Sequence, residues 1–173
     1  MTLPIVTYPD RRLKTISEAV ETFDASLHAL LDNMYETMMA FNGIGLAAIQ
    51  VNRPVQVLIL NLPEEDETQN KKNLLEIINP QITISEGTVF FQEGCLSVPG
   101  FYEDIERLET ITITYQDRHG KPNTLGADGL LSIAIQHEME HLQGKLFIEN
   151  LSYSRRKKFE KEYKKALKEK KRQ

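Results

Sequence analysis

Two histidines and a glutamate are spaced in the way that is typical of a metal-binding helix. His137, Glu138 and His141 form an H-E-x-x-H motif within the segment Gln136–His141. On an α-helix, positions i and i+4 lie on one face about one turn apart, so both imidazoles can bind the same ion. A carboxylate directly after the first histidine can handle the protons of a water that the ion activates. The motif predicts a hydrolase but leaves the third metal ligand undetermined.

The residues before the motif predict that this helix is buried. Leu130, Ile133 and Ala134 share one helical face with the two histidines. Asp128 is suited to cap the start of the helix, which is predicted to end at about Gln143. Histidines on an apolar face point toward the core. The alternative interpretation is therefore a pair of buried histidines with a purely structural role.

The third ligand is predicted to lie upstream of the motif. Metzincin proteases carry a third histidine at the position of Phe147, and no histidine follows His141 here. Glu149 is a possible downstream ligand. Upstream, Cys95 is the only cysteine, and it lies in Glu93–Gly100, whose glycines and proline predict a shaped loop instead of a regular strand. A lone cysteine is commonly a small buried apolar residue, but a thiolate with two imidazoles also suits a divalent metal with a fourth position open for water.

A glycine-rich segment, Gly43–Ala48, has the spacing of a dinucleotide-binding fingerprint. A predicted helix precedes it and a predicted strand follows it, which is the reverse of the order that the fingerprint requires, so no nucleotide cofactor is expected. Glycines here would allow close approach of a ligand or another segment. Gln50, just beyond, offers a neutral amide donor. The alternative is an ordinary tight turn.

The rest of the chain predicts an α+β fold, in which antiparallel strands pack around a central metal-bearing helix and a C-terminal helix follows. Apolar residues at helical spacing predict a first helix from Asp24 to about Phe41. Residues 1–23 are predicted to form a short strand, a turn and an irregular segment. Further strands are predicted at Val55–Leu60, Leu74–Ile78, Gln81–Ser85 and Thr110–Tyr115. Asn79 and Pro80 are expected to separate two of these strands.

Length and composition indicate a single soluble domain. The chain has 173 residues, of which 40% are hydrophobic and 27% charged. We expect a cytoplasmic protein without membrane contact, because there is no apolar run of the roughly 20 residues needed to cross a bilayer, no secretory signal and only one cysteine. Residues 1–151 are predicted to form the catalytic part, and residues 152–173 a basic C-terminal helix or tail of the same domain.

The C-terminal segment has a charge opposite to that of the rest of the chain. Residues 155–173 carry 11 basic and 3 acidic side chains, although the net charge of the whole chain is −4. A basic tail on an acidic body favours a polyanionic partner such as RNA. The alternative is a solvated terminal helix.

Three segments resemble the signature motifs of bacterial peptide deformylases in residue type, order and spacing. They are Gly43–Gln50, Glu93–Ser97 and Gln136–His141, and the flanking segments Tyr8–Asp10 and Ala127–Leu131 agree as well. The resemblance extends over nearly the whole chain. It implies a metal-dependent amide hydrolase that removes the N-formyl group from the N-terminal formylmethionine of nascent polypeptides and releases formate. It also implies a possible contact of the basic tail with the ribosome.

The resemblance also implies roles for individual residues. The implied metal ligands are Cys95, His137 and His141, with Fe²⁺ as the physiological ion and Zn²⁺, Ni²⁺ or Co²⁺ able to substitute. Glu138 is implied as the catalytic acid and base, and the Gln50 side chain and Leu96 backbone N–H as donors to the oxyanion. The residues expected to bind substrate are Ile44, Gly45, Phe91, Gly94, Leu130, Ile133 and Ala134.

Two residues depart from the family pattern. Glu140 stands where aspartate is usual, and we predict that Glu93, Arg107 and Glu140 form a charge network that orients the metal ligands. Tyr102 stands where many relatives carry arginine. Loss of that charge is expected to affect the grip on substrate or the inhibitor preference without altering the metal chemistry.

Two other functions remain open from the residues alone. A zincin-type endopeptidase would also use the H-E-x-x-H motif, but it would lack a role for the cysteine. A metal-stabilised protein that docks on RNA would need a fourth protein ligand to close the site. His28 and His119 are the remaining histidines, and their predicted positions, on a helix surface and at a hairpin tip, suit that role poorly.

Overall fold

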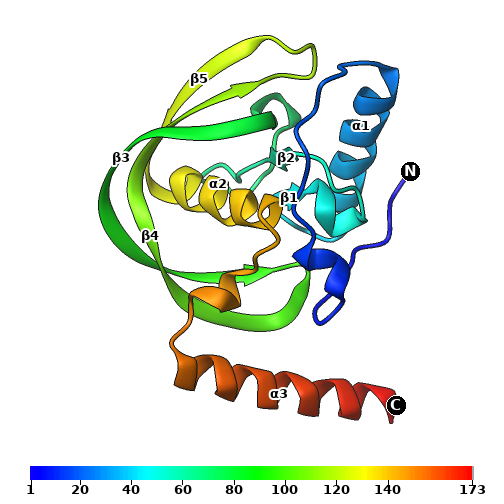
Figure 1. Cartoon of the computed structure of the whole chain (residues 1–173), viewed down its shortest axis with the longest axis vertical. Helices are drawn as coiled ribbons and strands as arrows, with labels where there is room; N and C mark the ends of the chain where they lie inside the picture. Colours follow the sequence, from blue (N-terminus) through cyan, green and yellow to red (C-terminus); the bar gives the residue numbers. More distant parts are fainter. Residues whose placement is uncertain (173) are drawn as a thin grey trace.

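A five-stranded antiparallel sheet curves around one central helix in the computed structural model, which describes residues 1–172 (Figure 1). The strands follow one another in sequence order across the sheet: β1 (Gly45–Ala47), β2 (Val57–Leu60), β3 (Leu75–Cys95), β4 (Val98–Gln116) and β5 (Pro122–Ala127). The α-helices are α1 (Ala25–Ala40), α2 (Gly129–Leu142) and α3 (Tyr153–Lys171). Short 3-10 helices cover Arg11–Lys14, Ala48–Val51, Lys71–Asn73 and Phe147–Asn150. The predicted α+β class and the C-terminal helix are confirmed.

The first helix, α1, begins and ends where the sequence predicts. The Asp24 side chain accepts a hydrogen bond from the Leu27 N–H and so satisfies one of the free donors at the helix start. Leu31, Met34 and Met38 are fully buried along one stripe of the helix. They pack with apolar side chains of β1 and β2 on one side of the sheet.

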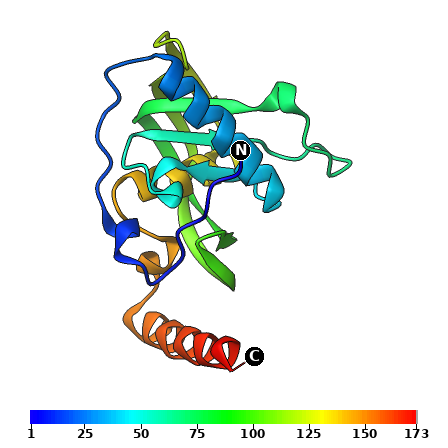
Figure 2. The same cartoon turned by 90° about the vertical axis from the view of Figure 1, so that its right-hand side faces the viewer.

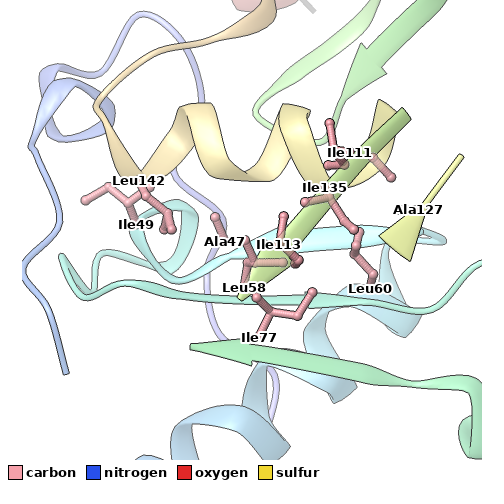
Figure 3. Close-up of a cluster of buried hydrophobic side chains, with 11 residues drawn as sticks. Ala47, Ile49, Leu58, Leu60, Ile77, Ile111, Ile113, Ala127, Ile135 and Leu142 are labelled. Carbon is pink, nitrogen blue, oxygen red and sulfur yellow. The ribbon is translucent and has the colours of Figure 1, made fainter. Parts of the chain in front are cut away.

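The central helix, α2, packs on the sheet face opposite to α1. Asp128 occupies the N-cap position, but its side chain makes no capping hydrogen bond. Figure 3 shows Ile135 of α2 over side chains of the sheet, and Leu142 beside Ile49 of the 3-10 helix that follows β1. Burial of this face holds the helix in place and leaves the adjoining face, with the two motif histidines, beside the end of β3.

The β3–β4 hairpin is much longer than the sequence predicts. The expected loop at Glu93–Gly100 is wrong, because β3 continues to Cys95 and β4 begins at Val98, with a tight turn between them. The expected break at Asn79 and Pro80 is also wrong, because β3 runs through it with only a shift in register. Asn79 adopts a positive φ of 52° there, and its side chain bonds to neighbouring segments, so the irregularity bends the strand without ending it.

The N-terminal segment contains no strand of the kind expected for residues 1–23. It crosses the molecule as an extended chain that makes isolated backbone bonds: Val6 N–H donates to Gln50 O at 2.7 Å, and Tyr8 N–H donates to Ser97 O at 2.7 Å. A single isolated β-bridge joins Glu18 to Val55, which precedes β2. Scattered bonds of this kind form no continuous ladder, which explains the missing strand. They do attach the segment to the 3-10 helix Ala48–Val51 and to the turn between β3 and β4.

The C-terminal helix, α3, lies at one end of the molecule (Figures 1 and 2). Phe159 and Tyr163 are its buried residues. Their rings contact Tyr8 and Phe101, and the Tyr163 hydroxyl donates to the Tyr8 carbonyl at 2.9 Å. One aromatic cluster therefore joins α3 to the rest of the fold, while most of its basic side chains face solvent.

Replacing Phe159 with alanine tests whether α3 belongs to the same cooperative unit as residues 1–151. Phe159 is 2% exposed, so Phe159→Ala is expected to lower the free energy of unfolding by about 3–5 kcal/mol. Urea denaturation followed by circular dichroism measures the change. Tyr153→Ala is the control at an exposed site on the same helix, with an expected change below about 1 kcal/mol. Equal stabilities of wild type and Phe159→Ala would show that α3 is energetically separate.

Candidate active site

A thiol and two imidazoles converge where the end of β3 meets α2. Cys95, His137 and His141 each offer a ligand atom, and these atoms lie within 4.8 Å of one another. The His141 Nε2 lies 3.5 Å from the Cys95 Sγ and 3.3 Å from the His137 Nε2. Tetrahedral donors bound about 2.0–2.3 Å from a zinc-like ion lie about 3.3–3.7 Å apart. The two distances from the His141 Nε2 match this spacing, so the three side chains could hold one divalent metal ion.

A buried ion pair holds the first of these histidines. Glu93 accepts from the His137 Nδ1 at 2.8 Å, which leaves the His137 Nε2 to face the other two donors. The Arg107 guanidinium makes two bonds to the Glu93 carboxylate, at 2.6 and 2.7 Å. It also contacts Glu140, which in turn accepts from the Asn150 side chain at 2.9 Å. The structure thus brings together the three residues of the predicted charge network.

Asn150 is a member of this network that the sequence analysis missed. It lies in the 3-10 helix after α2, and no motif marks it. The Glu140 carboxylate accepts from both Arg107 and Asn150, so the glutamate that stands where aspartate is usual links these two residues. Glu149, considered above as a third ligand, instead accepts from the Leu146 N–H at 2.9 Å. It is not part of the donor group.

The charges around the donors favour a cation at their centre. Burial lowers the pKa of His137, but hydrogen bonds to Cys95 and Glu93 outweigh it and raise that pKa to about 10. A positive charge at the His137 Nε2 is therefore stabilised, and a metal cation supplies that charge as well as a proton does. Burial lowers the pKa of His141 well below its ordinary value, so this imidazole is neutral, as a ligand must be.

The two carboxylates at the site differ in their environment. Burial raises the pKa of Glu93, but the bonds from Arg107 and His137 outweigh it and hold that pKa below its ordinary value. Burial raises the pKa of Glu138 to about 7, assisted by the negative charge of Glu93. Its Oε2 is buried and has no hydrogen-bond partner among residues 1–172. Glu93 is thus a fixed anion, whereas Glu138 is suited to exchange a proton.

The amide of Gln50 is held in one orientation beside the thiol. Its Oε1 accepts from the Ala47 N–H at 2.9 Å, which identifies the other end of the amide as the NH₂ group. That Nε2 donates to the Ser97 Oγ at 3.0 Å and lies 3.5 Å from the Cys95 Sγ. Ser97 in turn donates to the Val6 carbonyl at 2.7 Å, so the N-terminal segment supports the arrangement.

A cleft of about 610 Å³ opens above these groups. Its lining includes every residue expected to bind substrate: Ile44, Gly45, Phe91, Gly94, Leu130, Ile133 and Ala134. Gln50, Leu96, Cys95, His137, Glu138 and Tyr102 also line it. The lining residues that the sequence analysis missed include Ile5, Thr7, Phe41, Asn42, Leu60, Gln92 and Pro99. They belong to no motif, and the tertiary fold alone brings them here.

Two glycines of the cleft lie where a side chain would not fit. A Cβ on Gly45 would come within 2.7 Å of Leu60 and 3.0 Å of the Glu138 carboxylate. A Cβ on Gly94 would lie 2.5 Å from the Tyr102 ring. The Tyr102 ring therefore packs closely against Gly94, at the position where relatives were expected to carry arginine. The absence of Cβ atoms permits this close approach of neighbouring side chains to the backbone.

The other histidines and the metzincin position lie outside the donor group. His28 bonds through its Nε2 to the Arg118 carbonyl at 2.8 Å, and its ring contacts that of His119. Phe147, at the place of a metzincin third histidine, is 1% exposed, and its ring stacks on that of His137 at an angle of 25° with the centroids 6.0 Å apart. Neither arrangement provides a further ligand for the ion.

A buried three-donor group with an adjoining carboxylate, placed at the bottom of an apolar cleft, is the arrangement of a metal-dependent hydrolase. Comparison with known proteins narrows this class. The family model described as polypeptide deformylase matches residues 2–157. The chain belongs to the polypeptide deformylase family, whose members are metal-dependent hydrolases, and the resemblance inferred from the three motifs is confirmed.

Relatives and solved structures support this membership over the full length. The chain is 55% identical to a peptide deformylase of Wolinella succinogenes over 94% of this chain and 96% of the relative. It is 53% identical to one from Helicobacter pylori strain P12 over 99% and 98%, respectively. The crystal structure of a Legionella pneumophila peptide deformylase matches with a TM-score of 0.90 at 38% identity, covering 100% of this chain and 99% of that one.

No helix among residues 1–172 combines the length and apolar character needed to span a membrane.

Removing the Arg107 guanidinium tests how strongly the site depends on the buried ion pair. Arg107→Met would leave the Glu93 carboxylate buried without its cation, so the free energy of unfolding is expected to fall by about 3–5 kcal/mol. Arg155→Met is the matched control, because Arg155 pairs with Glu103 at the surface, and its loss is expected to cost less than about 1 kcal/mol. Urea denaturation measures both, and equal effects of the two substitutions would contradict the assigned role.

Proposed function

We propose that this chain hydrolyses the N-formyl group of the N-terminal formylmethionine of nascent polypeptides, with Cys95, His137 and His141 as the metal ligands. The observation that carries the proposal is the position of Glu138. It is 5% exposed, lines the cleft, and its Oε1 lies 3.9 Å from the His137 Nε2. Its Oε2 has no hydrogen-bond partner within residues 1–172, so this carboxylate beside three metal donors is placed to move protons during hydrolysis.

The edge of the sheet offers a binding surface for an extended peptide. β1 is the edge strand, and the Asn61 N–H donates to the Ile44 carbonyl at 2.8 Å. In an antiparallel ladder, bonded and non-bonded pairs alternate, so the N–H and C=O of the next residue, Gly45, point away from β2. An incoming peptide can add to this edge as a further strand. Gly94, on the other side of the cleft, offers a second backbone contact.

Apolar side chains in the cleft suit the methionine side chain of the substrate. Leu130, Ile133 and Ala134 lie on the face of α2 that carries the metal ligands, and Ile44 and Phe91 extend the apolar surface. An unbranched thioether is flexible and apolar, so it fills such a space well. Binding it there would bring the formyl group at its nitrogen toward Glu138.

The chain's own groups then perform the proton and charge chemistry. Cys95, His137 and His141 would hold a divalent ion, whose Lewis acidity would make water nucleophilic at neutral pH. The Glu138 carboxylate accepts the proton of the attacking water and delivers it to the amine nitrogen as formate leaves. The Gln50 Nε2 and the Leu96 backbone N–H donate to the negative charge that develops on the formyl oxygen.

Fe²⁺ is the ion that we propose for this site. A thiolate with two imidazoles also suits Zn²⁺, Ni²⁺ and Co²⁺, so the ligand set by itself does not select one of them. The assignment rests on the resemblance to bacterial deformylases. The cytoplasmic location expected from the sequence is consistent with an ion that air would oxidise.

The basic helix α3 is proposed as a contact to the ribosome. Its buried aromatic residues attach one face to the body, and Lys164, Lys165 and Lys168 are exposed. Ribosomal RNA is a polyanion, and lysines that face solvent can neutralise its phosphates. Such a contact would bring the cleft close to polypeptides as they emerge.

Replacing Glu138 separates metal binding from catalysis. Glu138→Gln preserves the size of the side chain but cannot accept the proton, so kcat for formate release from a formyl-Met peptide is expected to fall about 10²–10⁴-fold. Protein purified without oxygen should retain one equivalent of metal in both wild type and variant, measured by elemental analysis.

An exposed glutamate of β4 provides the control for this experiment. Glu106→Gln should release formate at the wild-type rate, because Glu106 faces solvent. An unblocked peptide should not be cleaved by either form, which separates deformylation from endopeptidase activity. Wild-type activity in Glu138→Gln with metal retained would refute the proposed role of this carboxylate.

Binding of α3 to ribosomes should depend steeply on salt. Each lysine that contacts a phosphate contributes to the slope of log affinity against log salt, so replacing Lys164, Lys165 and Lys168 by glutamine should reduce that slope by about 2. Co-sedimentation with purified ribosomes between low and physiological salt measures it. Affinity that does not change with salt, or with these substitutions, would exclude the contact.

A further inference from the structure

The segment between β2 and β3, residues 62–74, is an exposed loop with its own internal bonding. The Glu64 N–H donates to the Thr68 carbonyl at 2.8 Å, and the Asp66 carboxylate accepts from both the backbone and the hydroxyl of Thr68. Asn73 donates to the Glu64 carboxylate at 2.9 Å. The loop projects from the side of the sheet (Figure 2). These bonds give it a defined shape, although it buries little apolar surface.

One residue of this loop, Gln69, reaches back to the strands that border the cleft. Its Nε2 donates to the Gly43 carbonyl at 3.0 Å and to the Asn61 carbonyl at 2.7 Å. Gln69 is partly buried, whereas the loop residues beside it are exposed. The amide NH₂ group has two donors, and each is used on a different segment.

These bonds lie at the point where the ladder between β1 and β2 ends. The last bond of the ladder on this side runs from the Asn61 N–H to the Ile44 carbonyl. The Asn61 carbonyl instead accepts from Gln69, which also holds the carbonyl of Gly43. Gln69 therefore takes the place of a further ladder bond, and it fixes the backbone immediately before Gly45.

We propose that Gln69 is a positioning residue for substrate binding, acting through the backbone of Gly43–Gly45. This inference rests on the proposed function, in which an extended peptide pairs with the free edge of β1. A segment with two glycines in three residues has many accessible conformations, and ordering it on binding would cost affinity. Because Gln69 already orders this segment in the folded protein, the edge is in place before the peptide binds.

The geometry predicts a specific kinetic consequence. Among residues 1–172, the Gln69 side chain bonds only to backbone carbonyl groups, and it is not part of the cleft lining. Its loss should weaken the binding of peptide and leave the chemistry at Glu138 unchanged. The effect should therefore appear in KM, while kcat is preserved.

The test replaces the amide donor by groups of similar size. In Gln69→Glu a carboxylate faces two carbonyl oxygens, and in Gln69→Leu the donor is removed without adding charge. For formate release from a formyl-Met tripeptide, each variant should raise KM about five- to tenfold, the equivalent of one hydrogen bond. The kcat of each variant should stay within about twofold of the wild-type value. The backbone amides of residues 43–47 should exchange hydrogen faster in the variants than in the wild type.

Gln56→Glu is the control, since the Gln56 side chain likewise donates to a backbone carbonyl, that of Ser17 at 3.4 Å, but this bond lies away from Gly43–Gly45. It should leave KM unchanged. Wild-type KM in both Gln69 variants, or a loss of kcat equal to the rise in KM, would overturn the inference. Failure of the wild type to release formate would instead refute the proposed function, so the two failures are distinguishable.

Discussion

The ion pair between Arg107 and Glu93 is the interaction on which the arrangement of the site depends. A carboxylate that is 4% exposed is costly to bury, and the guanidinium offsets that cost through two parallel bonds. Glu93 lies on β3 opposite Glu103, and Arg107 lies on β4 opposite Val89, so the ion pair reaches diagonally across the hairpin. The same carboxylate holds His137 of α2. One pair of charges therefore fixes two strands and the central helix relative to one another.

The long hairpin gives this ion pair its position. β3 and β4 remain paired along their length, with shifts in register that allow the sheet to curve around α2. The tight turn between them places Cys95 at the end of β3, where its backbone is held by pairing with Val98 of β4. A thiol on a flexible loop would lose more conformational freedom when it binds a metal. The strand supplies that order in advance.

The chemistry of the site could be predicted from sequence more fully than its surroundings. His137 and His141 follow from helical periodicity, which is a local property. Cys95 was identified by its chemistry, but the glycines and proline near it wrongly predicted a loop, because pairing with β4 overrides local preference. Asn150 and Gln69 could not be predicted at all. Both act through hydrogen bonds of a side-chain amide to residues in other elements of the fold, and no spacing rule marks such contacts.

The path of the N-terminal segment has a consequence for how the enzyme is assembled. Val6 binds the backbone of Gln50, and Ser97 beside the metal donors binds Val6 in return. The first residues, the middle hairpin and the late helix α2 thus meet at one place, across long separations in sequence. Contacts of this kind form together with the whole fold. Retention of a bound metal ion would therefore report that the β3–β4 hairpin and α2 are folded together, because the hairpin supplies Cys95 and α2 supplies His137 and His141.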